Sequence, residues 1–204
     1  MKDQDKDYIR DIAEIRSMME RSSKFLSLSG WAGIMAGIYA LTGSFIAWKV
    51  LGFNPDRFDY SFEGSGVTNL LLLSIIILTL AVGTALVDSR HKAKSKGEKA
   101  WNATSRRMLI NMSVPLLSGG VLIIALIVNG LAGLAAPLTL LFYGLALYNA
   151  GHFTFKVLRI MGIVQIILGL ANVLFIQYGL LFWIFGFGVI HIIYGIYMHI
   201  RYAR

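Results

Sequence analysis

The fold class is decided by residues 67–87, which read VTNLLLLSIIILTLAVGTALV. This segment contains no charged side chain, and a helix of about 20 mostly apolar residues is long enough to cross a bilayer. Its apolar residues run continuously instead of alternating with polar ones, which favours a helix over a strand of a membrane barrel. The segment therefore predicts a transmembrane helix.

Five further segments of the same kind surround it. The predicted spans are about 28–51, 67–87, 108–129, 134–151, 157–177 and 180–200. Hydrophobic residues make up 56% of the 204 residues and charged residues only 15%, against about 25% charged in soluble domains. We expect an all-α polytopic membrane protein whose residues 26–204 form a compact bundle of six transmembrane helices. This composition excludes a soluble enzyme and a disordered chain.

Basic residues are distributed unequally between the two sides of the predicted spans. Seventeen of the nineteen Lys and Arg fall on the side that holds both termini, and only Lys49 and Arg57 fall on the other. By the positive-inside rule, we expect both termini to be cytoplasmic. Topology and attraction to anionic lipid account for the basic loop 90–107. We therefore expect no nucleic-acid partner, despite the net charge of +8.

Residues 1–25 precede the first span and have a different pattern. Their apolar side chains Tyr8, Ile12, Ile15 and Met19 recur at the spacing of one helix face. Acidic and basic residues balance in this segment, which is unlike a polybasic membrane anchor. We predict a cytoplasmic amphipathic helix that packs on its own bundle, on a second copy of the chain or on a soluble cytoplasmic partner.

Polar residues within the last two spans are the candidate functional residues, because such residues are costly in a membrane. They are Gln165, Asn172 and His191. The connection between these two spans is short, so we expect the spans to pair as a hairpin whose polar faces meet. Either these residues hydrogen-bond across a helix contact, or they line a path for a neutral or anionic solute. A cation path is not favoured, because no Asp or Glu follows Glu98.

Small residues repeat at helical spacing in three of the spans. We expect them to form close helix contacts, because glycine lets two backbones approach. The glycines concerned are Gly33, Gly37, Gly162, Gly169, Gly188 and Gly195. On the last two spans they share faces with the polar residues, so we expect Gly162 and Gly169 to face Gly188 and Gly195.

Motifs that would indicate an enzyme are missing from the sequence. The chain has no cysteine, no G-x-S-x-G or H-E-x-x-H motif and no P-loop. Its four histidines are scattered, whereas a metal site needs several ligands that converge. We expect no enzymatic activity, no catalytic residue, no metal and no cofactor.

Residues 19–30, MERSSKFLSLSG, lead into the glycine-rich first span. Over residues 15–45, the chain resembles a group of small multi-pass bacterial inner-membrane proteins of uncharacterised activity. The resemblance implies a bacterial inner membrane and no particular reaction. Together these features predict a non-enzymatic sensory or regulatory membrane protein that uses its N-terminal helix for interaction. The alternative is a small transporter or channel whose path lies between the last two helices.

Overall fold

The computed structural model describes residues 30–52, 65–95, 97 and 100–202. The predicted N-terminal helix, with Tyr8, Ile12, Ile15 and Met19, lies outside these residues. Part of the basic loop, at 96, 98 and 99, also lies outside them.

Every regular element in the described ranges is helical, and no strand occurs among them. The long helices are α2 (Gly30–Lys49), α3 (Ser65–Ser95), α4 (Ala103–Val128), α5 (Ala135–Ala150) and α6 (Lys156–Leu174). The last part of the chain contains α7 (Gly179–Trp183), the π-helix η3 (Ile184–Ile190) and α8 (His191–Tyr202). Two short 3-10 turns, η1 (Ala132–Leu134) and η2 (Ile176–Tyr178), connect neighbouring helices. The predicted all-α class is confirmed.

Six helical segments are long and apolar enough to cross a membrane. They are Gly30–Lys49, Thr68–Ser95, Ala103–Val128, Ala132–Ala150, Lys156–Leu174 and Ile176–Tyr202. Large apolar side chains are exposed on the outside of α3 and α4, such as Ile75 (58%) and Leu117 (68%). A soluble monomer rarely exposes a continuous surface of this kind. The helices therefore indicate a multi-pass membrane protein.

Two helices extend further than the apolar segments from which they were predicted. Helix α3 continues past 87 to Ser95, because Arg90, Lys92 and Lys94 are good helix formers although they are charged. Gly97 then adopts a left-handed φ of +68°, which glycine tolerates best. Helix α4 begins before the predicted residue 108, because Asn102 and Ser105 form a reciprocal capping box at its start.

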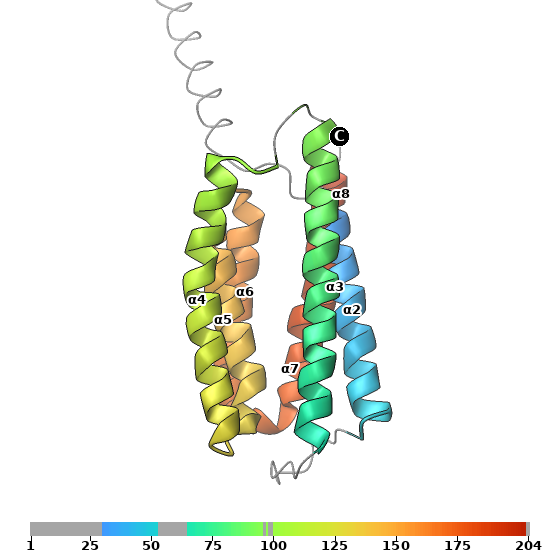
Figure 1. The fold of residues 1–204 in the computed structure, drawn as a ribbon, viewed down its shortest axis with the longest axis vertical. Coiled ribbons are helices and arrows are strands. Elements are labelled where there is room, and N and C mark those ends of the chain that lie inside the picture. The colour runs from blue at the N-terminus through green and yellow to red at the C-terminus, as the bar shows by residue number, and fades with distance from the viewer. Residues whose placement is uncertain (1–29, 53–64, 96, 98–99, 203–204) are drawn as a thin grey trace, which may run out of the picture.

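The helices form two units that lie side by side in Figure 1. The first unit consists of α2, α3, η3 and α8, in which α2 packs on α3, η3 and α8. The second unit consists of α4, α5 and α6, in which α5 packs on both neighbours, and α7 packs on α5 and α6. Within the first unit, the hydroxyl groups of Tyr39 and Thr84 are 3.2 Å apart and link α2 to α3.

A buried core joins the two units at one end of the molecule. It includes Met108 of α4, Leu147 of α5, Met161 of α6 and Met198 of α8. The described basic residues gather at this same end, which we call the basic end. They are Arg90, Lys92, Lys94, Arg106, Arg107, Lys156, Arg159 and Arg201. Only Lys49 lies at the opposite end among the described basic residues.

Candidate functional site

Two side chains from different helices bond to one backbone carbonyl in the interior, and a third side chain bonds to one of them. The Gln165 side chain of α6 donates from Nε2 to the Gly186 oxygen at 2.7 Å. His191 of α8 makes a second bond to the same oxygen through Nδ1, at 3.0 Å. Its other nitrogen, Nε2, is 2.8 Å from the hydroxyl group of Tyr143 on α5. We call Tyr143, Gln165, Gly186 and His191 the polar cluster.

This geometry determines the direction of each hydrogen bond. A carbonyl oxygen can only accept, so Nδ1 of His191 must carry the proton that it shares with Gly186. In the neutral imidazole, Nε2 is then an acceptor, and the Tyr143 hydroxyl donates to it. The cluster is thus a continuous chain of hydrogen bonds that links α5, α6 and the last membrane-spanning segment.

The Gly186 carbonyl lies inside the π-helix η3, not in a regular α-helix. A carbonyl oxygen has two lone pairs, and the two side-chain donors can occupy both. The packing around Gly186 is also tight, because a Cβ at this position would meet the Leu140 side chain and approach Gln165 Oε1 to 2.7 Å. A larger residue at the centre of the cluster would therefore displace the ends of the Leu140 and Gln165 side chains.

The polar cluster is shielded from the surroundings of the protein. Gln165 is fully buried and His191 is 5% exposed. Gln165 Oε1 has no hydrogen-bond partner among the described residues. These contacts can tie helices together, whereas an acid or base that acts on a substrate needs access to it.

Asn172 does not belong to the polar cluster, although it shares a helix face with Gln165. Its Nδ2 donates to the Phe175 carbonyl at 3.2 Å, so it satisfies the end of its own helix. Asn172 is fully buried, and its Oδ1 has no partner in the described part of the chain. The structure thus brings Gln165 and His191 together and leaves Asn172 apart from them.

The predicted contact between the glycine faces of the last two spans is wrong. Gly162 and Gly169 of α6 face α5, where a Cβ would come within 2.7 Å of backbone atoms of Tyr148 and Leu141. Helices α6 and η3 make only slight contact. Gly162 and Gly169 therefore do not meet Gly188 and Gly195.

Gly188 and Gly195 of the last span face α2 instead. A Cβ on Gly195 would lie 2.5 Å from the Gly30 carbonyl oxygen, and one on Gly37 would lie 2.7 Å from that of Gly188. Gly33 also approaches Gly195, with 3.2 Å from its added Cβ to the Gly195 Cα. The first and last spans are thus in backbone contact along much of their length.

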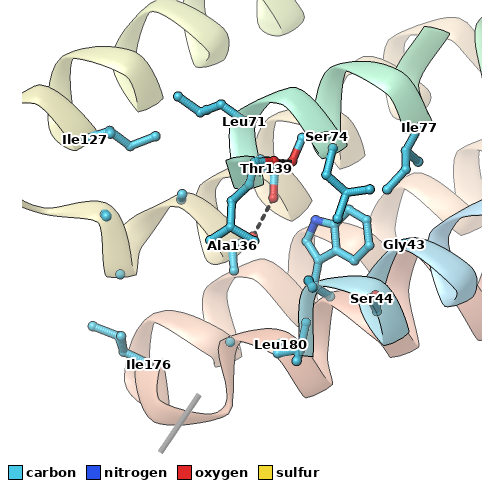
Figure 2. Close-up of a pocket in the computed structure, with 18 of the residues that line it drawn as sticks. Gly43, Ser44, Leu71, Ser74, Ile77, Ile127, Ala136, Thr139, Ile176 and Leu180 are labelled. Carbon is cyan, nitrogen blue, oxygen red and sulfur yellow. Dashed lines mark hydrogen bonds between the residues drawn. The ribbon is translucent and has the colours of Figure 1, made fainter. Parts of the chain in front are cut away.

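An apolar cavity of about 220 Å³ lies between the two units, at the end opposite the basic end. Leu71, Ser74 and Ile77 of α3 line one side of it, and Ile127 of α4 and Ala136 of α5 line another (Figure 2). The cavity is partly open, and none of its described lining residues is charged. We call it the outer cavity.

The hydroxyl groups of the outer cavity already have partners in their own helices. Ser44 donates to the Ala40 carbonyl at 2.9 Å, and Ser74 donates to the Leu70 carbonyl at 2.8 Å. Thr139 donates to the Ala136 carbonyl at 2.7 Å, as Figure 2 shows. The cavity therefore offers few free groups to a polar ligand. Gln165, Asn172 and His191 do not line it.

A series of aromatic rings connects the outer cavity to the polar cluster. Trp183 lines the cavity, and its ring centroid is 4.9 Å from that of Phe187. The Phe187 ring is in turn 5.1 Å from Tyr143 and 5.7 Å from His191, measured between centroids. A displacement of Trp183 would therefore move Phe187, and Phe187 would in turn move the rings of the polar cluster that it contacts.

Sequence reasoning missed Tyr143, Gly186 and the outer cavity. The repeated glycines at 186 and 188 were a signal of close approach, but no pattern marked the Gly186 carbonyl as an acceptor. In the described ranges, no three His, Asp or Glu side chains come together in a way that could hold a metal ion.

Comparisons with protein-family models, with curated proteins and with solved structures give no significant match to this chain.

Proposed function

We propose that the protein is a non-enzymatic sensory or regulatory membrane protein whose two helix units change their spacing in response to the bilayer. The outer cavity carries this proposal, because it lies where the units diverge, whereas a buried core joins them at the basic end. Helices that leave apolar space between them lack the dispersion contacts that would fix one spacing. The predicted interaction element is the N-terminal segment 1–25.

The packing of α3 supports the proposal that this helix, which forms one wall of the outer cavity, can move relative to the second unit. Its extensive contact among the described elements is with α2 alone, although five of its residues line the outer cavity. The ring series from Trp183 to His191 gives the cavity a direct physical connection to the polar cluster. A change at the cavity could thus reach the helices that end at the basic end.

We propose a bacterial inner membrane as the location, with both termini cytoplasmic. The concentration of positive charge at one end supports this orientation through the positive-inside rule. The same charges would attract anionic lipid along the loop 90–107. In this proposed orientation the interaction segment would be on the cytoplasmic side, where a second copy or a soluble partner could bind it.

Distance measurements across the outer cavity test the proposal. The chain has no native cysteine, so spin labels can be attached to Leu72→Cys on α3 and Ile124→Cys on α4, both of which are exposed. We expect this distance to differ between vesicles of short-chain and long-chain phospholipid, because thickness mismatch acts on loosely packed helices. A pair within the second unit, Ile124→Cys with Ile167→Cys, is the matched control and should stay constant. Identical distance distributions for the Leu72 pair in both lipids would contradict the proposal.

The alternative is a path for a neutral or anionic solute beside Gln165, Asn172 and His191. Two fully buried amide oxygens without described partners, Gln165 Oε1 and Asn172 Oδ1, favour it, since such atoms often bind ordered water. Solute flux into proteoliposomes should then fall when each of the three residues is replaced by alanine. Unchanged flux in all three variants would exclude them as the lining of a path.

A further inference from the structure

We propose that the outer cavity binds a hydrocarbon chain of a bilayer phospholipid, which enters between α3 and α4. This inference names a ligand for the cavity on which the proposed function rests. It follows from the chemistry of the cavity wall, from its size and from the medium to which it opens.

The residues that line the outer cavity favour an apolar ligand. Aliphatic side chains such as Leu71 and Ile77 form most of it, and no described lining residue carries a charge. Its Ser and Thr hydroxyls already bond to carbonyls of their own helices. The other polar groups of the lining are Gln177 and the indole of Trp183. A polar solute would therefore lose its hydration and gain few partners, which is costly in an apolar site.

The volume suits one segment of a chain. An apolar cavity of about 150 Å³ stays dry and binds a benzene ring, and the outer cavity holds about 220 Å³. Pockets for whole drug-sized molecules usually measure about 300–1,000 Å³. The outer cavity therefore accommodates part of a flexible hydrocarbon chain, whose remainder can stay in the bilayer because the cavity is partly open.

The surfaces on both sides of the cavity face lipid. Leu72 and Ile76 of α3 are 53% and 55% exposed, and Ile124 of α4 is 62% exposed, all within segments long enough to span the membrane. An acyl chain is the apolar group that is abundant at these surfaces. It can move from the lipid-facing surface of α3 into the cavity without crossing a polar region.

Quenching of Trp183 fluorescence by brominated lipid tests this proposal. The other three tryptophans, Trp31, Trp48 and Trp101, are exposed and can be replaced by phenylalanine. In the resulting full-length protein, Trp183 is the only indole, and it lines the cavity. Phosphatidylcholine brominated along its acyl chains should quench its emission strongly relative to unbrominated lipid, because such quenching requires near contact.

A filling substitution and a matched control separate the cavity from the general lipid surface. Ser74→Phe places a ring in the cavity and should remove most of the quenching. Ser118→Phe on α4 is the control, because Ser118 is also exposed and also bonds to a carbonyl four residues earlier, but it does not line the cavity. Quenching should persist in that variant. If Ser74→Phe lowers the helical content, Thr139→Phe fills the cavity from the opposite wall.

Three results would overturn the assignment. Trp183 emission that brominated lipid leaves unchanged would show that no acyl chain reaches the cavity. Equal quenching in the Ser74 and Ser118 variants would show that the bromines act from outside it. Quenching that rises as the protein is diluted in lipid would show that a second copy of the chain had occupied the cavity. The spin-label distances test the proposed function separately, so they can change even where Trp183 is not quenched.

Discussion

Replacement of Gly162 by alanine tests whether the α5–α6 contact depends on glycine. A Cβ at this position would lie 2.6 Å from the Tyr148 backbone nitrogen and 2.7 Å from the Gly144 carbonyl oxygen. Ordinary contact begins at about 3.4 Å, and backbone atoms cannot rotate away, so the two helices must separate by about 0.8 Å. A gap of 0.5–1 Å forfeits about a quarter to a half of the dispersion energy at each contact. Because overpacking costs about 1–3 kcal/mol, we expect Gly162→Ala to lower the free energy of unfolding by about 2 kcal/mol.

The assay is reversible unfolding in lipid bicelles, followed by steric trapping or by circular dichroism. Gly120→Ala on α4 is the matched control, because a Cβ there meets no atom within 4 Å. This control should be neutral or slightly stabilising, since alanine is the better helix former by about 0.5–1 kcal/mol. Equal stability of the Gly162 and Gly120 variants would refute the argument, because the close approach of the α5 and α6 backbones would then not contribute to the free energy of unfolding.

Two further predictions concern the polar cluster and the orientation. Gln165→Leu and His191→Phe should each cost about 0.6–1.7 kcal/mol, the range found for hydrogen bonds between membrane helices. Together they should cost more than their sum, because the Gly186 carbonyl then loses both side-chain donors; additive losses in a double-mutant cycle would contradict this. A cysteine at the exposed Ser95 should react with an impermeant maleimide only from the cytoplasmic side, and one at Asn129 only from the outside. The reverse labelling pattern would contradict the proposed orientation.

The helical class could be predicted from the sequence because lipid offers no hydrogen-bond partners to the backbone. A segment such as 67–87 must satisfy its own hydrogen bonds in lipid, and a helix does so within one segment. The ends of the helices could not be predicted from the sequence, because hydropathy marks the apolar part of a helix and not its termini. Helix α3 continues to Ser95 through charged residues, and the Asn102–Ser105 capping box starts α4 before its apolar part begins.

The polar cluster was predictable only in part. Helical spacing placed Gln165 and His191 on faces that avoid lipid, and the structure brings both to the same carbonyl. The third helix of the cluster was not predictable, because nothing distinguishes Tyr143 in the sequence from the other tyrosines of the chain. A backbone acceptor such as the Gly186 oxygen leaves no signal in the pattern of side chains.

The prediction of which helices pack together was wrong, and the reason for this error also explains the outer cavity. A short connection suggested that α6 and the last span would pack together, but lipid provides no hydrophobic force that favours sequence neighbours. Close fit between small residues then decides the pairing, so α6 packs on α5 through Gly162 while the last span packs on α2 through Gly195. These backbone contacts lie within the units, and the buried core joins the two units at the basic end. The polar cluster joins them again through Tyr143, Gln165 and His191. Beyond these two junctions, the space left between α3 and the second unit is the outer cavity.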